Sequence, residues 1–119
     1  MRGIRGAITI EENTAEAVMA ATQEVVAAML EANGIAAEDI GAAIFSATED
    51  ITAAFPAKGA RGLPGFDMVP LFDARQMDVE GALDMCIRVL LLADTDKKQR
   101  EIRHIYKGRA QKLRPDLPK

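Results

Sequence analysis

The chain has 119 residues and a formal net charge of -3, which suits one domain with one core and argues against non-specific nucleic-acid binding. Hydrophobic residues make up 49% but aromatic residues only 4%, so we expect a core of small and aliphatic side chains. A domain of this size with such a core often gains stability by oligomerising. The single cysteine excludes an intrachain disulfide and favours a reducing cytoplasm.

We expect neither a signal peptide nor a membrane-spanning segment. The N-terminus has no basic stretch followed by an apolar run. The longest apolar run, around residues 89–93, is far too short to cross a bilayer. No internal repeat, low-complexity tract or linker divides the sequence, so residues 1–119 are predicted to form one domain.

The first predicted elements are a strand and a long helix. Residues 4–10 have the apolar pattern of a strand. Asn13 followed by Glu16 resembles a capping box, with Asn in place of the usual Ser or Thr, and predicts the start of a helix. Apolar residues then recur at helical spacing to about Ala32, and an Asn-Gly pair ending at Gly34 supplies a left-handed stop.

The middle of the chain is predicted to hold two strands around a short helical turn. Residues 40–48 are apolar on both faces, as in a covered strand. Residues 55–62 are predicted as a helical turn with Pro56 at its first position. Residues 67–72 are predicted as a third strand, broken by Pro70.

The last third is dominated by one strong strand. An irregular polar stretch is expected over residues 73–80, and residues 86–93 carry the strongest strand signal of the chain. A short helix over 97–101, a fifth strand over 102–106 and a helical turn over 109–113 are predicted to follow. This alternation indicates a mixed α/β sheet with helices on one face.

Arg88 is the residue most informative about function, because it interrupts the apolar strand at 86–93. A buried guanidinium costs several kcal/mol unless an anion meets it, and it cannot lose its proton at any working pH. Either a carboxylate of the protein or an anionic ligand must therefore pair with it. A carboxylate of the protein as the partner would indicate a structural role for Arg88, whereas an anionic ligand would indicate an active site.

Other cations lie at strand ends or in apolar settings, and each alone is most simply an exposed side chain. If several of them converge on one pocket with Arg88, they suit a small substrate with more than one carboxylate. These residues are Arg5, Lys58, Arg61, Arg103 and Arg114.

The arrangements typical of nucleophilic or metal catalysis are poorly supported. Cys86 lies in an apolar run and is interpreted as a core residue rather than a thiolate nucleophile. His104 is the single histidine and is interpreted as structural, with no second histidine or cysteine cluster to offer zinc a site. The residues alone therefore predict an α/β domain with cations suited to a small polyanion.

Five short blocks occur in order over nearly the whole chain: residues 2–7, residues 55–58 with Arg61, residues 86–89, residues 102–106 and residues 113–117. Together they resemble the monofunctional AroH-class chorismate mutases, the small trimeric α/β type. The resemblance implies an α+β fold in which a mixed five-stranded sheet, covered by one long helix, assembles into a trimeric pseudo-α/β-barrel.

The resemblance also implies a reaction, the concerted Claisen rearrangement of chorismate to prephenate on the way to phenylalanine and tyrosine. This reaction uses no cofactor, no metal and no covalent intermediate. Negative charge grows on the ether oxygen of the departing enolpyruvyl group, and a fixed cation beside it lowers the barrier more than the ground state. By position, Arg88 is that cation.

Further site residues follow from the same resemblance, and they are expected to come from two chains because the family's sites lie between adjacent subunits. Arg5 and Tyr106 are expected to hold carboxylate groups, and Lys58 and Arg61 to add positive potential at the entrance. The remaining expected contacts are Phe55, Ala57 and Leu71 on the apolar wall, Phe72 and Asp73 near the ring, and Leu113 and Arg114 in a segment that orders over the ligand.

One position departs from the family pattern. Members carry a glutamate, which accepts a hydrogen bond from the ring hydroxyl, where this chain has Gln76, and often a cysteine where it has Asp73. The two positions are three apart in a segment expected to bend, so both are expected to face one pocket. Our hypothesis is that Asp73 takes the hydroxyl contact and balances Arg88. The alternative is that Asp73 is a turn residue and Gln76 alone suffices.

Two other functions remain open at this point. A small trimeric imine or enamine deaminase has a similar architecture and an interfacial arginine, but the block at 2–7 and the block at 113–117 favour the mutase. A non-catalytic trimer that binds an aromatic-pathway acid is the third reading. Loss of chorismate absorbance without added cofactor distinguishes all three.

Overall fold

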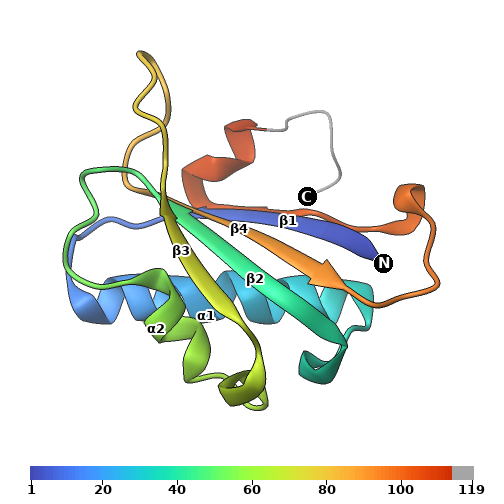
Figure 1. The fold of residues 1–119 in the computed structure, drawn as a ribbon. Helices are drawn as coiled ribbons and strands as arrows, with labels where there is room; N and C mark the ends of the chain where they lie inside the picture. The colour runs from blue at the N-terminus through green and yellow to red at the C-terminus, as the bar shows by residue number, and fades with distance from the viewer. Residues whose placement is uncertain (114–119) are drawn as a thin grey trace.

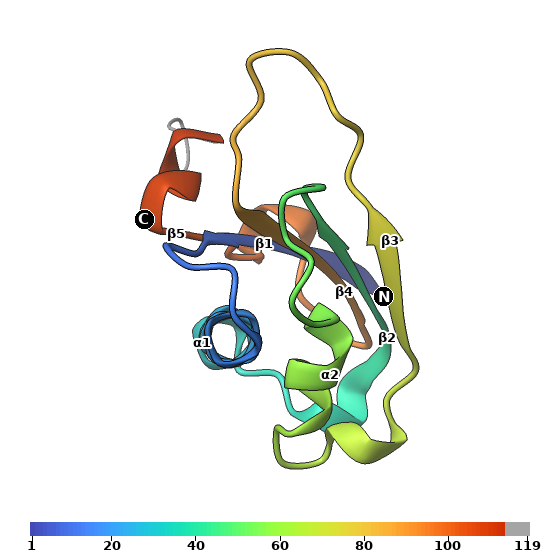
Figure 2. The ribbon, with the colours of Figure 1, turned by 90° about the vertical axis from the view of Figure 1, so that its left-hand side faces the viewer.

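A mixed sheet with helices on one face forms the structure, a computed structural model that describes residues 1–113 (Figure 1, Figure 2). Its helices and strands are β1 (Arg2–Thr9), α1 (Ala15–Asn33), β2 (Ile40–Ala47), α2 (Pro56–Arg61), β3 (Leu71–Arg75), β4 (Cys86–Ala93) and β5 (Ile105–Lys107). Short 3-10 helices occupy Ala37–Asp39, Phe66–Met68, Gln99–Glu101 and Gly108–Leu113.

The sheet has five strands in the order β3-β2-β4-β1-β5. The central strand β4 is antiparallel to both of its neighbours, β1 and β2, whereas the outer pairs β2–β3 and β1–β5 are parallel. The expected mixed sheet is therefore confirmed. Its helical cover is not one long helix alone, because the six-residue α2 lies beside α1 on the same side of the sheet (Figure 2).

The start of α1 differs by one residue from the prediction. Thr14, and not Asn13, caps the helix, since its side-chain oxygen accepts the Ala17 N–H at 3.1 Å. The Asn13 side chain instead accepts two backbone N–H groups of the segment before α2, each at 3.0 Å. The predicted left-handed stop is confirmed at Gly34, with φ of 61°.

Most of the core lies between the sheet and the two helices. The inward residues of β1, β2 and β4 alternate with outward ones, as strand geometry requires, and pack against the apolar stripe of α1. The fully buried side chains here include Ile4, Phe45, Ile87, Leu91, Val18, Val25, Val26 and Met29. None of the helices within residues 1–113 is long and apolar enough to cross a membrane.

The third strand begins later than predicted. Residues Phe66–Met68 form a 3-10 turn, and the pairing starts where the Pro70 carbonyl accepts the Ala43 N–H at 2.9 Å. From there β3 runs parallel to β2 as far as Arg75, so the first part of the predicted irregular stretch is strand. Long-range pairing with β2 overrides the weak local signal.

The fifth strand is shorter than predicted, whereas β4 has the predicted bounds. Before β5, the Asn33 side chain accepts the Arg103 N–H at 2.8 Å and donates to its carbonyl at 2.9 Å. A side chain at the end of α1 thus occupies the backbone groups that a longer strand would use. Pairing with β1 begins only at Ile105.

The sheet face opposite the helices, here named the open face, carries Arg5, Ile44, Phe72, Arg88 and Leu90. Strand pairing aligns these residues on one side, with Arg5 opposite Leu90, Leu90 opposite Ile44, and Ile44 beside Phe72. Both α-helices lie on the other side (Figure 2). Phe72 is 65% exposed, which is unusual for a phenylalanine in a strand and indicates surface available to a partner.

Candidate active site

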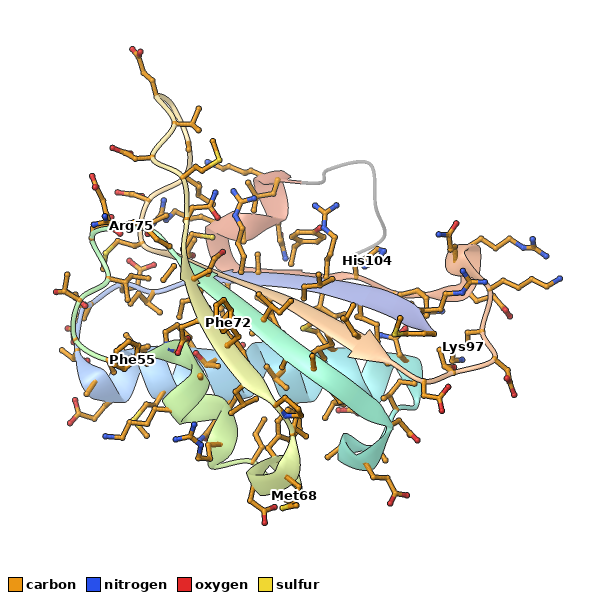
Figure 3. All side chains as sticks on the ribbon, viewed as in Figure 1. Phe55, Met68, Phe72, Arg75, Lys97 and His104 are labelled. Carbon is orange, nitrogen blue, oxygen red and sulfur yellow. The ribbon has the colours of Figure 1, made fainter. Side chains whose placement is uncertain are left out.

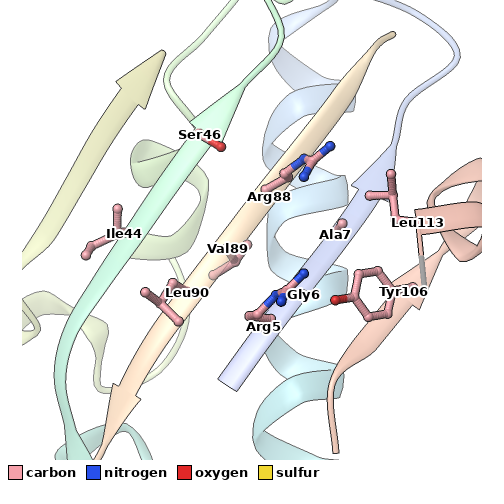
Figure 4. A pocket seen from close by; sticks show the side chains of 10 residues that line it. All are labelled: Arg5, Gly6, Ala7, Ile44, Ser46, Arg88, Val89, Leu90, Tyr106 and Leu113. Atoms are coloured by element: carbon pink, nitrogen blue, oxygen red, sulfur yellow. The ribbon is translucent and has the colours of Figure 1, made fainter. Parts of the chain in front are cut away.

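A pocket of about 250 Å³ lies on the open face above β1 and β4 (Figure 4). Strand register explains why its side chains meet, since Arg88 lies between Ala7 of β1 and Ser46 of β2 and all three project to the same side. Four residues expected at the site line it together. The lining is Arg5, Gly6, Ala7, Ile44, Ser46, Arg88, Val89, Leu90, Tyr106 and Leu113.

Arg88 enters this pocket without an acidic partner. It forms no ion pair with any residue in 1–113, and its Nε is buried with no hydrogen-bond partner. Arg88 is half-buried, so its guanidinium bears part of the cost of leaving water without an anion to offset it. Of the two alternatives posed by the sequence, the described part of the chain supplies no carboxylate, so an anion from outside it is the remaining partner.

Arg5 lies on β1, the strand next to β4, and Tyr106 lies on β5, one strand further along the sheet. The Tyr106 hydroxyl is buried, has no hydrogen-bond partner among residues 1–113 and points toward the Arg5 side chain (Figure 4). The Arg5 backbone N–H donates to Nδ1 of His104 at 2.9 Å, so the imidazole extends the β1–β5 ladder by one bond. His104 therefore holds Arg5 in place, in agreement with the structural role expected for it.

Gln76 reaches the same side of the sheet through Ser46. Its backbone N–H donates to the Ala47 carbonyl at 3.0 Å, which continues the β3–β2 pairing for one residue. Its side-chain Oε1 accepts the Ser46 hydroxyl at 3.1 Å. Gln76 therefore contacts Ser46, the direct neighbour of Arg88, but it does not line the Arg88 pocket itself and lines a separate pocket of about 210 Å³ instead.

Asp73 faces the other side of the sheet. It is the parallel neighbour of the buried Phe45, and its Oδ1 accepts the Ala57 N–H at 3.0 Å at the start of α2. The expectation that Asp73 and Gln76 face one pocket is therefore not met within the chain. The segment stays extended to Arg75, and residues three apart in a strand point to opposite faces.

A second group of expected site residues gathers around α2 and the β3 edge. A wide, open pocket of about 720 Å³ is lined there by Phe55, Lys58 and Asp73, with Phe55 at the start of α2 and 70% exposed (Figure 3). Ala57 is buried beneath it, hydrogen-bonded to Asp73. This group shares no lining residue with the Arg88 pocket.

The remaining expected residues lie outside both pockets. Arg61 is exposed at the end of α2, Leu71 is half-buried, and Phe72 stands on the open face (Figure 3). Arg114 lies outside the described residues. In residues 1–113 no group of three or more His, Cys, Asp or Glu side chains is arranged to hold a metal ion.

Cys86 is a core residue, as predicted. It is buried in a small cluster with Ala7, Tyr106 and Ala110, of which Ala7 and Tyr106 also line the Arg88 pocket. Burial raises the pKa of its thiol, and the nearby Arg88 guanidinium opposes that rise without cancelling it. The thiol therefore stays protonated at neutral pH and is no nucleophile.

Ser46 is the polar lining residue of the Arg88 pocket that the sequence interpretation missed. A signal for it exists, because it is the one polar residue in the apolar strand β2 and it shares the strand face of Ile44. Its importance depends on the register that places it against Arg88, which no local pattern reveals.

Known proteins match this chain over nearly its whole length. Residues 1–117 match the family described as chorismate mutase type I. The chain is 53% identical to chorismate mutase AroH of Thermus thermophilus, over 98% of this chain and 96% of that protein. It is 43% identical to chorismate mutase AroH of Bacillus subtilis strain 168, over 98% and 92%. A solved chorismate mutase from Clostridium thermocellum matches with a TM-score of 0.92 at 41% identity, covering 95% of this chain and all of that one.

Proposed function

The chain belongs to the chorismate mutase type I family, and on this premise we propose that each active site is formed by two adjacent chains of a homotrimer. The enzyme is an isomerase that rearranges chorismate to prephenate in aromatic amino acid biosynthesis. The deaminase reading is set aside, since the relatives that match over nearly the whole chain are chorismate mutases. We also place the enzyme in the cytoplasm, where its one cysteine can persist as a free thiol.

The separation of the expected site residues into two groups carries the shared-site proposal. Arg5, Arg88 and Tyr106 line one pocket, whereas Phe55 and Lys58 line another with no residue in common. A single chain therefore presents two incomplete sites. A rotation that brings the α2 group of one chain over the Arg88 pocket of the next completes each site, and three such steps close a ring.

Exposed apolar surface supports the same assembly. The open face carries Ile44, Leu90 and Leu92 beside the exposed Phe72, and both α-helices lie on the other side of the sheet. A small domain with a core of aliphatic side chains gains stability when such a face is buried. We propose that the open faces of three chains pack together to form the trimer's interior.

Within each shared site, Arg88 stabilises the charge that develops on the ether oxygen. Strand pairing on both sides fixes the Arg88 backbone, and its guanidinium lacks an ion-pair partner among residues 1–113, so no ion pair has to break when substrate arrives. The bond from carbon to oxygen breaks as the new carbon–carbon bond forms, and the cation favours this transition state over the ground state.

The other side chains bind and orient the substrate. Arg5 and the Tyr106 hydroxyl hold its carboxylates, and the narrow pocket favours the compact conformer that the rearrangement needs. From the adjacent chain, Lys58 adds positive potential, with Asp73 in the same pocket. Arg61 closes the entrance, Phe55, Ala57 and Leu71 form the apolar wall, and Phe72 lies near the ring. Leu113 with Arg114 covers the ligand.

Subunit mixing tests the shared site. Arg88→Ala removes the cation from one half-site, and Phe55→Glu places a carboxylate on the other half-site, where it repels the dianionic substrate. Each variant alone should lose chorismate turnover. Co-refolded at equal amounts, they should recover about one quarter of the wild-type activity, because each mixed trimer contains one intact site.

The measurement is loss of chorismate absorbance without added cofactor, together with the mass in solution. Recovery at the mass of three chains supports the proposal. A mixture that remains inactive, although its chains exchange, would show that each chain builds its own site. Exchange itself is checked by mixing one tagged and one untagged chain and recovering both on the tag.

A further inference from the structure

Ser46 occupies a defined place at the Arg88 pocket. It lies on β2 directly opposite Arg88 on β4, and its side chain lines the pocket (Figure 4). Its hydroxyl donates to Oε1 of Gln76 at 3.1 Å. Gln76 is itself fixed, since its backbone N–H donates to the Ala47 carbonyl at 3.0 Å. The Ser46 proton is therefore directed away from the pocket.

This arrangement makes the Ser46 oxygen an acceptor. A hydroxyl has one donor and two lone pairs, and donating its proton leaves the lone pairs available and strengthens them as acceptors. The amide oxygen of Gln76 is engaged by Ser46, and Gln76 does not line the Arg88 pocket, so it offers no second acceptor there. Arg5 and Arg88 also only donate.

The substrate offers a group that matches this acceptor. Chorismate carries two carboxylates, an ether oxygen and one ring hydroxyl. At neutral pH the carboxylates and the ether oxygen can only accept, so they suit the two arginines and Tyr106. The ring hydroxyl is the single donor of the substrate, and it requires an acceptor when it leaves water.

We propose that Ser46 accepts the hydrogen bond of the substrate's ring hydroxyl and that Gln76 is the positioning residue that orients Ser46 for it. This assignment rests on the proposed substrate site in the Arg88 pocket. Two consecutive hydrogen bonds result: the ring hydroxyl donates to the Ser46 oxygen, and the Ser46 hydroxyl donates to Gln76 Oε1. It places a neutral acceptor beside Arg88, so the Arg88 charge remains free for the ether oxygen.

A pair of inhibitors tests the contact directly. The probes are a bicyclic dicarboxylate that mimics the transition state and the same molecule without its hydroxyl. The inhibition constants of both are measured on the wild-type enzyme and on Ser46→Ala. The variant should bind the hydroxylated mimic about tenfold more weakly and the deoxy mimic with unchanged affinity.

Two further variants distinguish the role of Ser46 as the acceptor from the role of Gln76 as the positioning residue. Ser46→Thr keeps the hydroxyl and should preserve most of the preference for the hydroxylated mimic. Gln76→Ala should reduce that preference, and combining it with Ser46→Ala should add nothing, because both act on one contact. A crystal structure with the hydroxylated mimic should place its hydroxyl within about 3 Å of the Ser46 oxygen.

Three results would overturn the assignment. Equal weakening of both mimics by Ser46→Ala would show that Ser46 has a general structural role. Loss of the preference in Asp73→Asn, with Ser46→Ala unaffected, would show that the carboxylate of an adjacent chain makes the contact. If the wild type turned over chorismate but bound both mimics equally, no hydroxyl contact would exist. Failure of the wild type to bind either mimic would instead reject the proposed substrate site.

Discussion

Arg88 links stability and activity at the scale of a single residue. Its Nε is buried without a partner and no ion pair with residues 1–113 compensates its charge, so the empty enzyme carries a cost that substrate relieves. Arg88→Met keeps a similar side-chain length and removes the charge. We expect the free energy of unfolding to rise by about 1 kcal/mol and kcat to fall about 10²- to 10³-fold.

Urea denaturation at a fixed protein concentration and chorismate absorbance measure the two effects. Arg100→Met is the matched control, because Arg100 is exposed in the turn Gln99–Glu101 and touches neither pocket. It should change neither quantity. A loss of stability in Arg88→Met would mean that Arg88 has a partner in the assembled enzyme when substrate is absent.

We expect the buried thiol of Cys86 to make the folded protein less stable at alkaline pH. Burial raises the pKa of its thiol, so the folded chain keeps this proton in a range where the unfolded chain releases it. Stability therefore falls as pH rises above the ordinary thiol range, by at most about 1.4 kcal/mol per pH unit. Cys86→Ala should flatten this decline in urea denaturation series between about pH 8 and pH 10. Parallel profiles for the two proteins would contradict the prediction.

At the scale of elements, local pattern predicted most of the fold. β4 was predicted with its observed bounds because a run of eight residues, apolar except for Arg88, ends before Asp94. β5 was predicted too long because Asn33, seventy residues away, occupies the Arg103 backbone. Contacts between distant segments, which set register and strand ends, are not visible in local periodicity.

The candidate site was predictable to a similar degree. Arg88 was recognised because a permanent charge in an apolar strand is expensive wherever the strand is placed. Ser46 was missed because its role depends on the β2–β4 register. Asp73 and Gln76 do not share a pocket within one chain, because the segment remains extended and strand alternation then separates them.

The close contact between α1 and α2 should be sensitive to one methyl group. A Cβ added at Gly59 would lie 2.9 Å from Met19 Cα and 3.0 Å from its carbonyl oxygen, and backbone atoms cannot move aside as a side chain can. Gly59→Ala should therefore cost about 1–3 kcal/mol. It should also lower chorismate turnover, because α2 carries Lys58 and begins next to Phe55.

Gly41→Ala is the control for that substitution. A Cβ at Gly41 would meet its nearest atom, the Leu92 carbonyl oxygen, at 3.7 Å, which is an ordinary contact. Its unfolding free energy should stay within about 0.5 kcal/mol of the wild type. If Gly59→Ala were equally neutral, α2 would have to shift freely on α1, and its positioning role would be lost.

At the scale of the whole molecule, a positive charge on the open face should disrupt the trimer, whereas the same charge on the exposed side of α1 should not. The larger hydrophobic cluster lies between the sheet and the helices, and the smaller one on the open face does not include Leu92, so a folded chain does not depend on contacts at Leu92. Leu92 stands on the open face opposite Gly3 and Ala42 and lines neither pocket. Leu92→Arg should therefore separate the trimer into folded single chains.

Activity should be lost with the assembly, because each separated chain keeps only half of each site. Ala27→Arg places the same charge on the exposed side of α1 and should leave both mass and turnover unchanged. Light scattering after size exclusion, circular dichroism and chorismate absorbance provide the three readouts. A folded, active single chain of Leu92→Arg would mean that one chain builds a complete site, and it would reject the shared-site proposal. Because Leu92 touches no substrate pocket, a loss of activity can be traced to assembly rather than to chemistry.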